Sequence, residues 1–134
     1  MQHSLPLTLA ALVAALLVYV WAALRCGQAR SKYGVDAPAV TGDPGFERAF
    51  RAQQNTVEQM VLFLPLLGLA ALLWGDLWAG IYGAVWCIGR LLYIETYARA
   101  ADKRSLGFLL SGGVSMGVLI AVIVTFALRH FGIG

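Results

Sequence analysis

The sequence has few charged residues. Lys, Arg, Asp and Glu make up 13% of its 134 residues, whereas hydrophobic residues make up 60%. A water-soluble domain usually carries about a quarter charged residues, so this composition argues against a soluble enzyme or a soluble binding module. The ten basic residues follow no nucleic-acid-binding motif, and we expect no nucleic-acid partner.

Cysteine and histidine are also scarce. The two cysteines, Cys26 and Cys87, are far apart and lack CxxC spacing, and the two histidines stand near the ends of the chain. A disulfide framework or a structural zinc site needs several such residues at short, regular spacing. We therefore interpret both cysteines as small apolar residues, and we predict no metal site.

Long apolar stretches are the main feature of the sequence. They cover residues 4–24, 59–75, 77–89 and 105–128. A helix of about 20 apolar residues crosses the hydrocarbon core of a bilayer. The first and last stretches reach this length alone, and the middle two reach it together with neighbouring polar residues. The sequence therefore predicts an all-α membrane protein, a four-transmembrane-helix bundle that forms a single integral membrane domain. The expected helices cover approximately residues 4–31, 46–74, 77–101 and 105–130. In the last of them, Gly113 and Gly117 form a GxxxG pattern, which is typical of close helix packing in lipid.

The basic residues are distributed unevenly over the connections between these helices. Nine of the ten lie in or beside the first and third connections, and only Arg129 falls on the other side. Because basic residues accumulate in cytoplasmic loops, we expect loops 1 and 3 in the cytoplasm and both termini on the opposite side. Richness in Ala, Leu and Gly favours a bacterial protein, and hence an inner membrane.

Two polar stripes interrupt the apolar pattern near the expected cytoplasmic ends. At about 100° per residue, Arg51, Asn55 and Glu58 fall within about 40° of arc on the second helix, while Gln53 points almost the opposite way. A second stripe, on the third helix and just beyond it, consists of Arg90, Tyr93, Tyr97 and Arg104. Glu95 lies off this stripe, and we expect it to pair with Arg99 one turn later.

These polar residues allow two interpretations. In the first, they only satisfy one another: Glu58 pairs with an arginine, and the tyrosines anchor the chain at the membrane interface. Against this, Arg30, Arg51, Arg90 and Arg104 outnumber Glu58, and surplus charge at the edge of hydrocarbon is costly. Such a surplus suits an anion that arrives from the cytoplasm. Glutathione, a small peptide with two carboxylates, an amine and a thiol, matches this set of side chains.

Residues 46–58, FERAFRAQQNTVE, resemble the second-helix signature of the membrane-associated proteins in eicosanoid and glutathione metabolism (MAPEG). The likeness is to the glutathione-transferase and leukotriene-synthase branch of that family. The segment PAVTGDP at 38–44 resembles the same branch, as does the pattern Arg90-x-x-Tyr93-x-x-x-Tyr97 followed by Arg104. The similarity spans about residues 25–108. It implies a homotrimer with glutathione as co-substrate, bound between subunits near the cytoplasmic surface.

The resemblance also implies roles for individual residues. Arg104 would stabilise the glutathione thiolate, which attacks a lipophilic electrophile or reduces a lipid hydroperoxide that diffuses in from the membrane lipids. The glutathione ligands from one subunit would be Arg51, Asn55, Glu58, Tyr93 and Tyr97, and those from its neighbour Arg30 and Gln53. We count Arg90 among the glutathione-binding candidates because it shares their stripe. Since Arg51 and Gln53 point in opposite directions, both touch one glutathione only if they belong to different subunits.

Two positions depart from the pattern of this branch. Gln59 stands where an aromatic residue is usual, and Pro65 follows Glu58 by seven residues rather than three, so we expect a deeper kink and a different lipophilic pocket.

Two other functions remain open. A non-catalytic lipid-binding relative is disfavoured because Arg51 and Glu58 are retained. A small four-helix multidrug transporter usually carries a carboxylate in its first helix, and residues 4–24 contain none.

Overall fold

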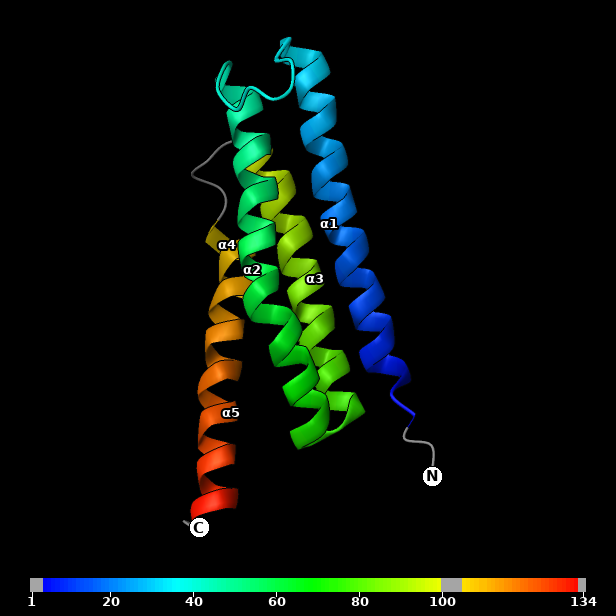
Figure 1. Cartoon of the computed structure of the whole chain (residues 1–134), viewed down its shortest axis with the longest axis vertical. Helices are drawn as coiled ribbons and strands as arrows, with labels where there is room; N and C mark the ends of the chain where they lie inside the picture. The colour runs from blue at the N-terminus through cyan, green and yellow to red at the C-terminus, as the bar shows by residue number, and fades with distance from the viewer. Residues whose placement is uncertain (1–3, 100–104, 133–134) are drawn as a thin grey trace.

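The chain folds into a bundle of long helices that run side by side (Figure 1). A computed structural model describes residues 4–99 and 105–132. The helices are α1 (Pro6–Tyr33), α2 (Pro44–Trp74), α3 (Asp76–Arg99) and a last segment composed of α4 (Ser105–Phe108), the π-helical turn η2 (Leu109–Gly113) and α5 (Val114–Phe131). These four stretches are long and apolar enough to cross a membrane. The predicted all-α, four-transmembrane-helix architecture is therefore confirmed.

Local signals in the sequence set the helix ends. Gly34 adopts a left-handed conformation (φ 67°) and ends α1 two residues later than expected. Asp43 caps α2, because its side chain accepts a hydrogen bond of 2.8 Å from the backbone N–H of Gly45. Pro44 occupies the first helical position, where its missing N–H costs nothing, so α2 begins two residues before residue 46. Helix α2 then continues through Pro65 to Trp74.

Asp76, the first residue of α3, also holds the start of α1. Its carboxylate accepts hydrogen bonds from the backbone N–H of Leu7 (3.0 Å) and from the backbone N–H and hydroxyl of Thr8 (2.8 Å each). The first N–H groups of a helix have no partner within it. One carboxylate therefore caps α1 and ties it to the turn between α2 and α3.

The core of the bundle lies between α1, α2 and α3. At its centre Phe63 and Trp86 stack with ring centroids 4.1 Å apart, and Phe63 also meets Tyr82 at 5.1 Å. All three rings are buried. Many Leu, Val and Ile side chains on the outer faces stay exposed, as is expected of a surface that meets lipid or another subunit.

Helix α3 meets the last helical segment with almost no side chain between the two backbones. A methyl group added to Gly107 would lie 2.6 Å from the Cα of Tyr93 and 2.8 Å from the carbonyl oxygen of Gly89. One added to Gly89 would lie 2.9 Å from backbone atoms of Leu110 and Ser111. Small residues permit this kind of close crossing in membranes. The predicted GxxxG site differs, since no atom of the described residues lies within 4 Å of a methyl group on Gly117.

Candidate functional site

A groove opens between the N-terminal half of α2 and the C-terminal end of α3. It lies at the end of the bundle where α1 leads into α2, opposite to the start of α1 and the end of α5 (Figure 1). Its volume is about 460 Å³, and its lining consists of Phe50, Arg51, Gln54, Asn55, Glu58, Tyr93, Tyr97 and Phe108. Five residues of the two predicted stripes therefore face one space: Arg51, Asn55, Glu58, Tyr93 and Tyr97.

The groove has a charged rim and an aromatic wall. Arg51 and Glu58 are exposed on α2, one on each side of the half-buried Asn55. Tyr93 and Tyr97 are buried on α3, with ring centroids 5.4 Å apart. Within residues 4–99 and 105–132, no arginine forms an ion pair with Glu58. The groove thus offers a cation and an anion on one rim, an arrangement that suits a ligand with charges of both signs.

Arg90 lies behind the groove wall rather than in it. Its side chain is 0% exposed. Its guanidinium donates hydrogen bonds to the side-chain oxygens of Asn55 (3.0 Å) and Thr56 (2.9 Å), and it lies 4.2 Å from the ring centroid of Tyr93. Arg90 therefore touches two groove residues from inside the bundle. Its position on the stripe of Tyr93 and Tyr97 does not reveal this depth, because α2 covers it.

Arg30 and Gln53 do not line the groove of their own chain. The guanidinium of Arg30 donates a hydrogen bond of 2.7 Å to the carbonyl oxygen of Ala39 and lies 4.8 Å from the ring centroid of Phe46. Arg30 thereby holds the first loop against the start of α2. Gln53 is half-buried on a different face of α2 from Arg51. The remaining candidate, Arg104, lies outside the described residues.

Three groove residues were missed by the sequence analysis: Phe50, Gln54 and Phe108. Phe50, Gln54 and Glu58 follow one another at intervals of four residues, so the helical period could have found the first two. Phe108 belongs to α4 and reaches the groove only because α4 packs closely on α3. Gln59, in turn, lies near Gly112 of η2, since its amide nitrogen would be 3.5 Å from a methyl group there.

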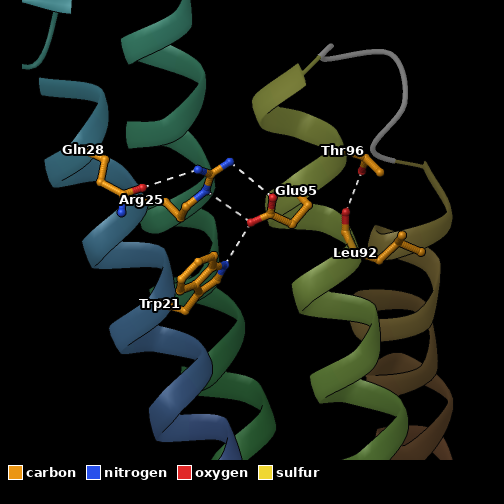
Figure 2. A network of polar contacts seen from close by, with 6 residues as sticks. All are labelled: Trp21, Arg25, Gln28, Leu92, Glu95 and Thr96. Carbon is orange, nitrogen blue, oxygen red and sulfur yellow. Dashed lines mark hydrogen bonds and ion pairs between the residues drawn. The ribbon is translucent and has the colours of Figure 1, made fainter. Parts of the chain in front are cut away.

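Glu95 forms an ion pair between helices on the α1 side of α3 (Figure 2). Its carboxylate lies 3.2 Å from the Nε of Arg25 on α1, and it accepts hydrogen bonds from Nη2 of Arg25 (3.2 Å) and from the indole N–H of Trp21 (2.9 Å). The expected pairing of Glu95 with Arg99 is therefore wrong. Helix α1 packs beside α3 and presents Arg25 at the height of Glu95, which the period of a single helix does not show.

Comparison with known proteins places these features in a family. A sequence model of the MAPEG family matches residues 8–124. The chain is 44% identical over 117 residues to an uncharacterized protein of Synechocystis, a match that covers 86% of this chain and 85% of that protein. It is 49% identical over 92 residues to human microsomal glutathione S-transferase 2, covering 69% and 63%. It is 35% identical over 115 residues to leukotriene C4 synthase of Bos taurus, covering 86% and 76%.

Proposed function

The chain belongs to the MAPEG family, and from this premise we propose that it is a membrane-bound glutathione transferase. It would activate the glutathione thiolate for attack on a lipophilic electrophile, with reduction of a lipid hydroperoxide as a second activity. The observation that carries the proposal is the groove in which Arg51, Asn55 and Glu58 face two tyrosines. Human microsomal glutathione S-transferase 2, 49% identical over the matched region, is named for this reaction.

The charges of glutathione correspond to the groove side chains. A guanidinium binds a carboxylate through two parallel hydrogen bonds, so we assign a glutathione carboxylate to Arg51. The carboxylate of Glu58 accepts hydrogen bonds from the ammonium group of the ligand. We assign the polar groups of the peptide backbone to the phenols of Tyr93 and Tyr97 and to the amide of Asn55, which line the groove. The aromatic rings of Phe50 and Phe108 cover the apolar parts of the ligand.

The chemical step is activation of the thiol. A free thiol has a pKa of about 8.5 and is mostly protonated at neutral pH. Lowering this pKa by about two units requires about 2.7 kcal/mol of preferential stabilisation of the anion, which one guanidinium in a partly desolvated site supplies. We assign this role to Arg104, because arginine stays charged at every relevant pH. The sulfur then bonds to an electrophilic carbon of the second substrate while the leaving group departs with the electrons of the broken bond.

We further propose that the glutathione sites lie between the subunits of a homotrimer. Support comes from Arg30 and Gln53, which line no part of the groove in their own chain and would complete the groove of a neighbour. The groove lies at the same end of the bundle as the basic residues beside the first loop, so we propose that it is on the cytoplasmic side of a bacterial inner membrane. The lipophilic substrate would reach it laterally from the bilayer.

Purified protein in detergent is expected to conjugate glutathione to 1-chloro-2,4-dinitrobenzene, followed by absorbance of the product. Arg51→Ala is expected to raise KM for glutathione by about 10-fold or more, because a charge-assisted hydrogen bond is lost. Lys32→Ala removes an equivalent charge from α1 outside this groove and serves as the matched control. Absence of turnover together with stabilisation by a lipid ligand would instead support a binding protein, and proton-coupled uptake into vesicles a transporter.

Co-expression of two defective variants tests the shared site. Arg51→Ala damages one side of each site, and Gln53→Glu places a negative charge on the other side, so at glutathione well below KM each variant alone is expected to keep about a tenth of wild-type activity or less. In randomly mixed trimers, about a quarter of the sites combine the two undamaged sides, because each interface pairs different surfaces of its two subunits. Activity near a quarter of wild type is the expected result. No recovery in trimers shown by crosslinking to be mixed would contradict a site built by two subunits.

A further inference from the structure

We propose that Arg90 is a positioning residue. It fixes the orientation of the Asn55 side-chain amide, so that the N–H groups of this amide point toward the ligand, and it connects the groove to the π-helical turn η2. The proposal rests on the proposed glutathione site, but it assigns Arg90 no contact with glutathione. It is carried by the contacts of a fully buried guanidinium that joins α2, α3 and η2.

The contacts of Arg90 connect three parts of the chain. On α2, its Nη1 donates to Asn55 Oδ1 at 3.0 Å and its Nη2 donates to Thr56 Oγ1 at 2.9 Å. On η2, Ser111 Oγ lies 3.3 Å from Nη1. On α3 itself, the guanidinium packs over the ring of Tyr93. Burying such a group between apolar helices is costly, and an apolar side chain would fill the same space at lower cost. The position of the guanidinium therefore points to a role beyond packing.

The hydrogen bond to Asn55 determines what the groove offers. Arginine has only donors, so the amide of Asn55 must turn its oxygen toward Arg90. The two N–H donors of the same amide are then left for the groove, which Asn55 lines. Beside Arg51, these donors suit an oxygen acceptor such as a carboxylate or a peptide carbonyl. The reversed amide would present an acceptor beside Glu58 and would repel the same ligand.

The contact with Ser111 connects Arg90 to the last helical segment, which carries the groove residue Phe108. Ser111 donates a hydrogen bond of 2.8 Å to the carbonyl oxygen of Gly107 and accepts one from Arg90. Phe108, which lines the groove, lies between these two residues. Single π-helical turns within an α-helix occur frequently at functional sites. Arg90 thus holds Asn55 of α2, Tyr93 of α3 and the segment that carries Phe108 in register around the groove.

Arg90→Lys is the variant that tests this role. Lysine keeps the charge but has no planar fork that reaches three acceptors together. We expect KM for glutathione to rise about tenfold, kcat to change less than about threefold, and the pH midpoint of kcat to stay in place, because the thiolate-stabilising group is untouched. Since Arg90 acts mainly through Asn55, Arg90→Lys combined with Asn55→Ala is expected to raise KM by well under the product of the two single effects.

Arg25→Lys is the matched control, because Arg25 also joins two helices but does so through Glu95, outside the groove. It is expected to lower thermal stability at most and to leave KM for glutathione unchanged. If Arg90→Lys fails to fold, Thr56→Ala and Ser111→Ala replace it. Each removes one anchor of the guanidinium and is expected to raise KM about two- to fivefold, again with less than a multiplicative effect when combined with Asn55→Ala.

If the increases in KM caused by the Arg90 and Asn55 substitutions multiply fully in the double variant, the positioning role is overturned. A shifted pH midpoint of kcat in Arg90→Lys would overturn it as well. In both cases, conjugation by the wild-type protein would leave the proposed function intact. A purely structural Arg90 would lower the yield and stability of the protein with KM unchanged, which also overturns the proposal. Wild-type protein that neither binds nor conjugates glutathione would remove the proposed function, and the positioning role with it.

Discussion

Replacing Arg104 with alanine is expected to lower glutathione conjugation at pH 7 by about 25-fold. This factor is the ratio of ionised thiol at pH 7 for a pKa of about 6.5, which the proposed arginine maintains, to that for a pKa of about 8.5 without it. The pKa of the bound thiol is raised in the variant, so activity lost at neutral pH returns as the pH rises. A pH–rate profile of kcat measures the change directly.

The shape of that profile separates the proposed role from a general loss of activity. Wild type is expected to approach its plateau by about pH 7, whereas Arg104→Ala gains nearly tenfold per pH unit until about pH 8 and approaches wild type above about pH 9. Arg99→Ala is the matched control, since Arg99 is an exposed arginine in the last turn of α3 and lies off the polar stripe. An unchanged midpoint in Arg104→Ala, or the same shift in Arg99→Ala, would remove Arg104 from thiol activation.

The period of a single helix predicted much of the groove. Arg51, Asn55 and Glu58 recur on one face of α2, and Tyr93 and Tyr97 recur on one face of α3. Two such faces can meet when their helices are neighbours, and the short connection at Gly75 makes α2 and α3 neighbours. The lengths of the four apolar stretches predicted the four-helix bundle, because bilayer thickness fixes the length of a helix that spans it.

Contacts between helices were not predictable in this way. Arg90 shares the stripe of the tyrosines, yet its burial depends on how far α2 lies across α3. Glu95 pairs with Arg25 because of the relative height of α1, and Phe108 reaches the groove because α4 meets α3 at two glycines. Each of these features depends on the offset and spacing of two helix axes. Sequence periodicity within one helix contains no information on either quantity.

The largest loss of stability is expected at Gly107. A Cβ atom there would meet the backbone N and Cα of Tyr93 and the carbonyl oxygen of Gly89, the last two at 2.6 and 2.8 Å. Backbone atoms within helices cannot rotate away as a side chain can, so α4 must move from α3. We predict that Gly107→Ala destabilises the protein by about 3 kcal/mol or more, at the upper end of the cost of overpacking. Thermal unfolding in detergent measures the change.

Gly107→Ala should also impair the groove in whatever protein still folds. Displacing α4 moves Phe108 from the groove wall and Ser111 from Arg90, so KM for glutathione is expected to rise together with the loss of stability. Gly117→Ala is the matched control, because its Cβ would meet no atom within 4 Å in the part of the chain that the structure describes, and alanine favours a helix over glycine by about 1 kcal/mol. That variant is expected to unfold at or slightly above the wild-type temperature. If Gly107→Ala keeps the stability and the KM of the wild-type protein, α3 and α4 lie farther apart than the close backbone contact at Gly107 implies. The link from Arg90 through Ser111 to the groove would then lose its structural basis.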